Sequence, residues 1–172
     1  LPPKEVTLTA TFETSNQALR AGIDTFQSQI MPLALTFFDG NVNWHTKLIQ
    51  PNGKYFLAIR LGGRPRAMER QVNDYYSLCQ NNGATSLDKL DESSSDNFWQ
   101  NLADFGWDES IKPIVVGRVS LLPSRIADLT KAFKNLKHSN DLHPAILAHP
   151  GYGNIMINWF AEYEDCLLYT SD

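Results

Sequence analysis

The segment His149-Pro-Gly-Tyr-Gly-Asn154 places a histidine and an asparagine on either side of two glycines. An imidazole can take up a proton near neutral pH, and a carboxamide can donate a hydrogen bond to a carboxylate or carbonyl oxygen. Gly151 and Gly153 permit a tight connection beside a ligand or another chain. An alternative is purely structural, because Pro-Gly and Gly-Asn are also common in hairpin turns. The segment therefore indicates either a candidate site or an ordinary turn.

Two arginines near the centres of expected strands are candidates for binding a substrate carboxylate. Arg60 falls within the expected strand 54–61, and Arg118 falls within 114–122. A guanidinium group can hold a carboxylate with two parallel hydrogen bonds. In the alternative, each arginine lies on the solvent face of a sheet or pairs with another subunit, since most arginines are exposed. Arg118 is the better placed of the two, because it follows Gly117 among apolar residues.

The other histidines and the known sequence motifs point to no further chemistry. His45, His138 and His143 fall in expected loops without the paired spacing of a zinc site, so we expect them to be solvated and predict no metal. The glycine-rich motifs of phosphate and dinucleotide binding are absent, as is the Gly-x-Ser-x-Gly motif of hydrolases.

Composition and charge indicate one soluble globular domain of 172 residues. The net charge of −4 argues against non-specific binding of nucleic acid. No apolar run reaches the roughly 20 residues of a membrane span. Cys79 and Cys166 are too few for a disulfide framework, so we expect a reducing, cytoplasmic location, with Cys79 in the core.

The periodicity of apolar residues predicts an α+β fold. Strands are expected over 6–12, 33–38, 54–61, 84–90, 114–122, 145–148 and 155–160. Helices are expected after a cap at Ser15 or Asn16, from Pro65 to near Gly83, and from Pro123. A further helix is expected at the end of a polar loop over 91–96, with Ser95 or Asp96 as its cap. This order predicts two ferredoxin-like β-α-β halves that form one antiparallel sheet with helices on one face. The other face would then need a cover.

The glycine segment resembles the His-x-Gly-x-Gly-Asn segment in the C-terminal domain of FAD-linked oxidases, which are flavoproteins of the vanillyl-alcohol-oxidase type. Phe98-Trp99, the run 119–124 and the start of the chain resemble the same domain less specifically. Tyr152 stands where the family usually has aspartate, and Met156 stands where many members have a second histidine. Methionine is a poor ligand for a hard metal ion, so these differences argue against a metal-assisted dehydrogenase. The resemblance is closest to the FAD-binding subunit of glycolate oxidase.

This resemblance implies that residues 1–165 are the substrate-side, or cap, domain of an FAD-dependent oxidoreductase. The enzyme would oxidise a small 2-hydroxy acid such as glycolate or lactate. FAD would be bound mainly by an upstream domain, so this fragment alone is expected to be inactive. Flavin and iron–sulfur subunits are the expected partners, and the cytoplasmic assembly could attach to the inner membrane through them.

The resemblance also implies roles for the candidate residues. His149 would orient the substrate or act as a base. Gly151, Gly153 and Asn154 would approach the flavin edge. Arg118 and Arg60 would bind the substrate carboxylate.

Two further hypotheses concern the end of the chain and a different function. Residues 166–172 resemble the read-through of a sequencing adapter, which would make Cys166 non-native; the alternative is a short strand over 167–170. The main rival function is a non-catalytic ferredoxin-like interaction module of a multisubunit complex. A second rival is a small free-standing enzyme with a cavity between sheet and helices.

Overall fold

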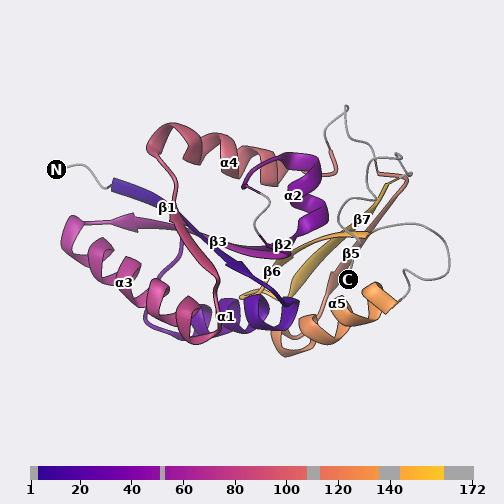
Figure 1. The fold of residues 1–172 in the computed structure, drawn as a ribbon, viewed down its shortest axis with the longest axis horizontal. Coiled ribbons are helices and arrows are strands. Elements are labelled where there is room, and N and C mark those ends of the chain that lie inside the picture. The colour runs from indigo at the N-terminus through magenta and orange to yellow at the C-terminus, as the bar shows by residue number, and fades with distance from the viewer. Residues whose placement is uncertain (1–3, 51–52, 108–112, 136–143, 161–172) are drawn as a thin grey trace.

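The computed structural model describes residues 4–50, 53–107, 113–135 and 144–160. Over these residues, strands form one seven-stranded sheet in the order β4-β1-β3-β2-β6-β7-β5 (Figure 1). All of the strand pairs are antiparallel. The strands are β1 (Lys4–Phe12), β2 (Ala34–Asp39), β3 (Tyr55–Gly63), β4 (Ser86–Lys89), β5 (Val115–Ser120), β6 (Pro144–His149) and β7 (Asn154–Trp159).

Helices cover both faces of this sheet. The helices α1 (Ser15–Gln27), α3 (Pro65–Asn81) and α5 (Ile126–Asn135) lie on one face, and α2 (Gly40–Thr46) and α4 (Glu92–Asp104) lie on the other (Figure 1). The α+β class and the antiparallel sheet are confirmed, but α2 and α4 extend the helices beyond the single face that we expected. The physical reason is that neighbouring strand residues bury apolar side chains on opposite faces, as Phe37 and Phe38 do.

The sheet is built from two similar halves. Strands β1 to β4 with α1 and α3 have the ferredoxin-like order β4-β1-β3-β2, and β5, α5, β6 and β7 repeat the first part of that arrangement. The halves join where β2 pairs with β6, with Phe37 opposite Ala148 and Phe38 opposite Leu147. The two strands that meet occupy the same position in their respective halves. The structure thus confirms the two-part organisation.

The helix starts follow local capping chemistry. Pro65 occupies the first turn of α3, as predicted. Thr14, rather than Ser15 or Asn16, caps α1 through a reciprocal pair of bonds with Gln17. Asp91 caps α4 by accepting a hydrogen bond from the backbone N–H of Ser94 at 2.8 Å. The prediction of a loop over 91–96 was therefore wrong, because a serine-rich first turn has weak intrinsic helix propensity but a strong cap.

The short helix α2 changes the setting of His45. Asp39 caps α2 by accepting a hydrogen bond from the backbone N–H of Val42, so a helix begins directly after β2. His45 is half-buried with its ring centroid 3.9 Å from that of Phe160, so the prediction that it is solvated was wrong. Burial first, and the nearby charge of Lys47 second, lower the pKa of His45. His138 and His143 lie outside the described residues.

Cys79 is a buried core thiol, as predicted, whereas Cys166 lies outside the described residues. Burial raises the pKa of the Cys79 thiol to about 12. The hydroxyl of the neighbouring Tyr75 donates to the carbonyl of Leu57 on β3 at 2.9 Å. This bond anchors α3 to the sheet.

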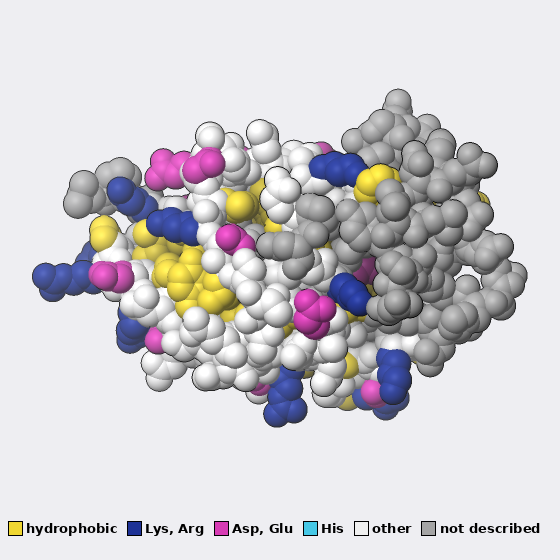
Figure 2. Space-filling model, viewed as in Figure 1, with side chains coloured by type: hydrophobic (Ala, Val, Ile, Leu, Met, Phe, Trp, Pro, Cys, Tyr) yellow, Lys and Arg dark blue, Asp and Glu magenta, His cyan; other side chains and the backbone are white. Residues whose placement is uncertain are grey.

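One face of the molecule carries mixed charge. Lysine and arginine side chains are interspersed with aspartate and glutamate on the face in view, and apolar side chains gather toward the left (Figure 2). Across the ranges that the structure describes, none of the helices combines the length and apolarity needed to cross a bilayer.

Candidate functional site

A cavity of about 740 Å³ lies on the α4 face of the sheet, where the two halves meet. Its floor comes from β2, β6, β7 and β5. One wall comes from α4, which contributes Trp99, Leu102 and Ala103. The predicted site residues His149, Asn154 and Arg118 all line this cavity. The fold therefore brings together His149 from β6, Asn154 from β7 and Arg118 from the edge strand β5.

Four polar side chains form a row across the cavity floor. His149 and Asn154 are register partners on β6 and β7, and Asn154 is also the partner of Ser120 on β5. The Oγ of Ser120 donates to Asn154 Oδ1 at 2.8 Å. The Oγ1 of Thr36 on β2 lies 3.3 Å from His149 Nδ1. We call Thr36, His149, Asn154 and Ser120 the polar row.

Thr36 and Ser120 were not predicted from the sequence. Each is a polar residue with an apolar residue on either side, and that contrast was the available signal. Their proximity to His149 and Asn154 depends on strand register, which a single sequence does not specify between distant strands.

The glycine segment forms the hairpin between β6 and β7. The backbone N–H groups of Tyr152 and Gly153 both donate to the carbonyl of His149 at 3.0 Å. The structural alternative thus describes the local conformation correctly. The same hairpin also places its two polar ends, His149 and Asn154, side by side on the cavity floor. Turn and candidate site are therefore one feature.

Arg118 lies on the β5 edge of the cavity and is exposed. Its guanidinium carbon lies 4.8 Å from the ring centroid of Trp107, a favourable cation–π distance. Within the described residues, Arg118 forms no ion pair with a carboxylate. A guanidinium group at the edge of a cavity can bind an anionic ligand.

A family model described as "FAD linked oxidases, C-terminal domain" matches residues 1–167. The chain belongs to this family. Two solved structures of alkyldihydroxyacetonephosphate synthase share the fold of this FAD-linked oxidase domain. One has a TM-score of 0.63 at 12% identity, covering 95% of this chain and 37% of the synthase chain. The other has a TM-score of 0.58 at 13% identity, covering 90% and 34%. No curated protein matches the sequence.

The two glycines of this FAD-linked oxidase domain pack against its own chain. A Cβ at Gly151 would collide with the ring of Phe26 on α1. Gly153 has a φ of 71°, and a Cβ there would collide with the backbone carbonyl of Leu121. Neither glycine is among the residues that line the cavity. The close approach predicted for them is thus made to α1 and to the segment after β5, and their contact with a cofactor stays a prediction.

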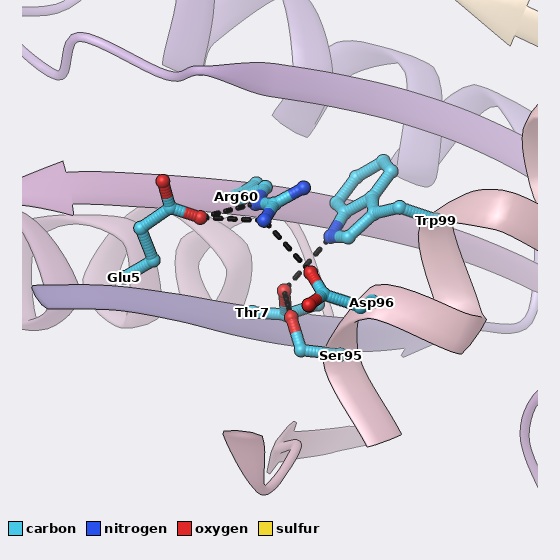
Figure 3. A network of polar contacts seen from close by, with 6 residues as sticks. All are labelled: Glu5, Thr7, Arg60, Ser95, Asp96 and Trp99. Carbon is cyan, nitrogen blue, oxygen red and sulfur yellow. Dashed lines mark hydrogen bonds and ion pairs between the residues drawn. The ribbon is translucent and has the colours of Figure 1, made fainter. Parts of the chain in front are cut away.

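Arg60 does not line the cavity of the domain. Its guanidinium pairs with Glu5 at 2.6 Å and with Asp96 at 2.9 Å (Figure 3). With its charge engaged by two carboxylates, Arg60 is poorly suited to bind a substrate carboxylate. The structure separates it from Arg118, which was predicted to share that role.

The family implies FAD, and the cavity has groups that suit a flavin ring. Within the polar row, the amide N–H₂ of Asn154 and the ring of His149 can hydrogen-bond to the polar edge of the ring system. Trp99, Leu102 and Met156 supply apolar surface for its faces. In the described part of the chain, no three His, Cys, Asp or Glu side chains are grouped so that they could hold a metal ion.

Proposed function

We propose that this chain is the substrate-side domain of an FAD-dependent oxidoreductase that oxidises a small 2-hydroxy acid of the glycolate or lactate type. The observation that carries the proposal is that His149, Asn154 and Arg118 line one cavity. A 2-hydroxy acid presents a carboxylate, a hydroxyl and an α-hydrogen. The cavity offers a cation for the first group and a base for the second.

Each residue of the site has a distinct role in this proposal. Arg118 binds the carboxylate through its guanidinium N–H groups. The Thr36 hydroxyl engages Nδ1 of His149, so Nε2 is the nitrogen left to accept the proton of the substrate hydroxyl. Ser120 engages the Oδ1 of Asn154, which leaves the amide N–H₂ to donate to the oxygen of the forming carbonyl. Bound flavin supplies the acceptor for the hydride that leaves the α-carbon.

The remainder of the enzyme lies outside this chain in our proposal. The chain spans about a third of the synthase chains that share its fold, at 37% and 34%. We propose that another domain binds most of the FAD, with flavin and iron–sulfur subunits as partners. The assembly would work in the cytoplasm, alone or attached to the inner membrane through those subunits.

The test is oxidation of glycolate and of both lactate enantiomers by the flavin-loaded protein that contains this chain, with a dye as electron acceptor. His149→Gln keeps a polar side chain but removes the base, and we expect kcat to fall by about 100-fold or more while flavin content is unchanged. Undiminished turnover in this variant would remove His149 from the mechanism.

A non-catalytic interaction module is the second candidate, and the edge strand β5 favours it. Val115 and Val116 on β5 and Ile114 before it are 53%, 44% and 60% exposed. An apolar strand at a sheet edge can pair with another chain. In this alternative, Val116→Lys weakens subunit assembly while His149→Gln has no effect on any turnover.

A further inference from the structure

Helix α4 forms a wall of the cavity, and apolar side chains attach it to the sheet. Phe98 and Leu102 are 3% and 5% exposed, and the Phe98 ring lies edge-on to Phe38 of β2 with centroids 6.2 Å apart. Such contacts fix the helix to the sheet, but they are not directional. Burial of Phe98 and Leu102 selects the face of α4 that meets the sheet.

A second set of contacts is polar and directional. The indole Nε1–H of Trp99 donates to the Thr7 hydroxyl on β1 at 2.8 Å, and the same hydroxyl bonds to Ser95 (Figure 3). Ser95 and Trp99 are one helical turn apart, so Thr7 contacts one side of α4 at two points. Arg60 on β3 reaches the same turn through Asp96. We call Thr7, Ser95, Arg60 and Asp96 the α4 clamp.

The clamp accounts for residues that the site itself does not use. The Thr7 side chain is fully buried in β1, where an unpartnered hydroxyl would be costly. Its partners are both on α4. The Arg60 guanidinium likewise pairs with Glu5 and Asp96 and does not line the cavity. These residues therefore hold α4 in place on the sheet, and they hold Trp99 in particular.

Trp99 is the largest α4 side chain that lines the cavity, and it shares the cavity with the polar row. An indole held by its N–H occupies a fixed part of the cavity that also holds that row. We propose that Trp99 determines substrate specificity by limiting the group carried on the α-carbon of the substrate, and that Thr7 and Arg60 are positioning residues for it. The substrate class in this inference rests on the proposed function, whereas the positioning of Trp99 does not.

The positioning is tested on the 172-residue chain with ¹⁵N-labelled tryptophan. The Trp99 indole N–H resonance is assigned by its loss in Trp99→Phe. We expect hydrogen exchange of this indole to rise about tenfold in Thr7→Val, which has the same shape without the hydroxyl, and to return toward the original rate in Thr7→Ser. Arg60→Gln is expected to speed the exchange of the first α4 amides by a few-fold.

The matched control is Arg70→Gln. Arg70 pairs with Asp74 within α3, on the opposite face of the sheet, at 3.9 Å. Arg70→Gln should leave the hydrogen-exchange rates of the Trp99 indole and of the α4 amides unchanged. Equal indole exchange in the original chain and in Thr7→Val would overturn the positioning role. If Thr7→Val does not fold, Ser95→Ala gives the same test from the α4 side of the contact, with a smaller expected increase.

Specificity is tested in the flavin-loaded protein that contains the chain. Trp99→Ala should raise kcat/KM for 2-hydroxyoctanoate relative to lactate about tenfold or more, because a hydrophobic pocket discriminates by size. An unchanged ratio overturns the specificity role even if the indole result stands. If the original protein does not oxidise 2-hydroxy acids, the proposed function and the substrate class are wrong. The positioning role of Thr7 is then still decided by the indole exchange rates.

Discussion

His149 and Asn154 lie directly opposite each other in the β6–β7 pairing, at the two ends of the hairpin that joins these strands. A hairpin of this kind fixes the spacing of its first and last residues through backbone hydrogen bonds. The two side chains consequently reach the cavity as a unit, and each is held from its outer side by a hydroxyl, from Thr36 or from Ser120. The Thr36 hydroxyl comes from β2, which neighbours β6, and the Ser120 hydroxyl comes from β5, which neighbours β7.

Removing the hydroxyl that holds His149 should lower the rate more than it lowers substrate affinity. We expect Thr36→Val to reduce kcat about tenfold in the flavin-loaded protein with little change in KM, because the imidazole loses its oriented partner. Thr130→Val is the control, since Thr130 bonds to Ile126 within α5. Equal steady-state kinetics for the two variants would argue against an orienting role for Thr36.

Arg118 should act on substrate affinity. Replacement by methionine keeps the apolar stem and removes the charge, so we expect KM for lactate to rise by about 10- to 100-fold. The rise should be absent for a neutral analogue such as an α-hydroxy amide. A similar loss for both compounds would indicate a structural effect instead of carboxylate binding.

Gly153 and Gly151 should differ in their tolerance of a methyl group. Gly153 has a left-handed backbone against a fixed carbonyl, so Gly153→Ala should lower the free energy of unfolding by about 2–3 kcal/mol. At Gly151 the obstacle is the Phe26 side chain, which is 44% exposed and can move, so about 1 kcal/mol is expected.

Urea unfolding measures both glycine variants. Phe26→Ala should relieve the effect of Gly151→Ala but not that of Gly153→Ala. Additive effects of Phe26→Ala and Gly151→Ala would show that the Phe26 ring is not the obstacle.

His45 should make stability depend on pH. Its pKa is lowered from 6.5 in the folded chain, so below about pH 6.5 the unfolded chain binds more protons than the folded one. The free energy of unfolding should therefore fall as the pH drops through this value, until the folded chain is protonated as well. Urea unfolding at pH 7.5 and pH 5.5 tests this, and His45→Gln should show a smaller fall. The same fall in both chains would assign the effect to other groups.

Cys79 should be unreactive in the folded chain. Its thiol is buried with a pKa of about 12, so little thiolate is present at pH 8. Iodoacetamide should leave Cys79 unmodified until urea unfolds the chain, as followed by mass spectrometry of the peptide that contains it. Rapid labelling without denaturant would show that α3 opens locally.

The parts of the fold that follow from short-range patterns could be predicted from the sequence. The start of α3 at Pro65 and the β6–β7 hairpin around Gly151 and Gly153 depend on residues close in the chain. Helix α2 was missed because seven residues carry too little periodicity to distinguish a helix from a loop.

The candidate site was predictable only in part. His149 and Asn154 belong to a local motif, but Thr36 joins His149 from 113 residues away. That contact depends on β2 pairing with β6, and nothing near either residue in the sequence specifies the pairing. For Arg60, the prediction depended on strand position alone, whereas its partners Glu5 and Asp96 come from two other elements.

The junction of β2 with β6 makes the two halves of the sheet dependent on each other for function. The cavity takes Thr36 from the first half, Trp99 from α4, which packs on β1 of that half, and His149, Asn154 and Arg118 from the second half. Neither half alone contains a complete site. A molecule that contacts both sides binds more tightly when the halves are associated, and by linkage it strengthens their association by the same free energy. Substrate affinity and cohesion of the sheet are therefore thermodynamically linked in this domain.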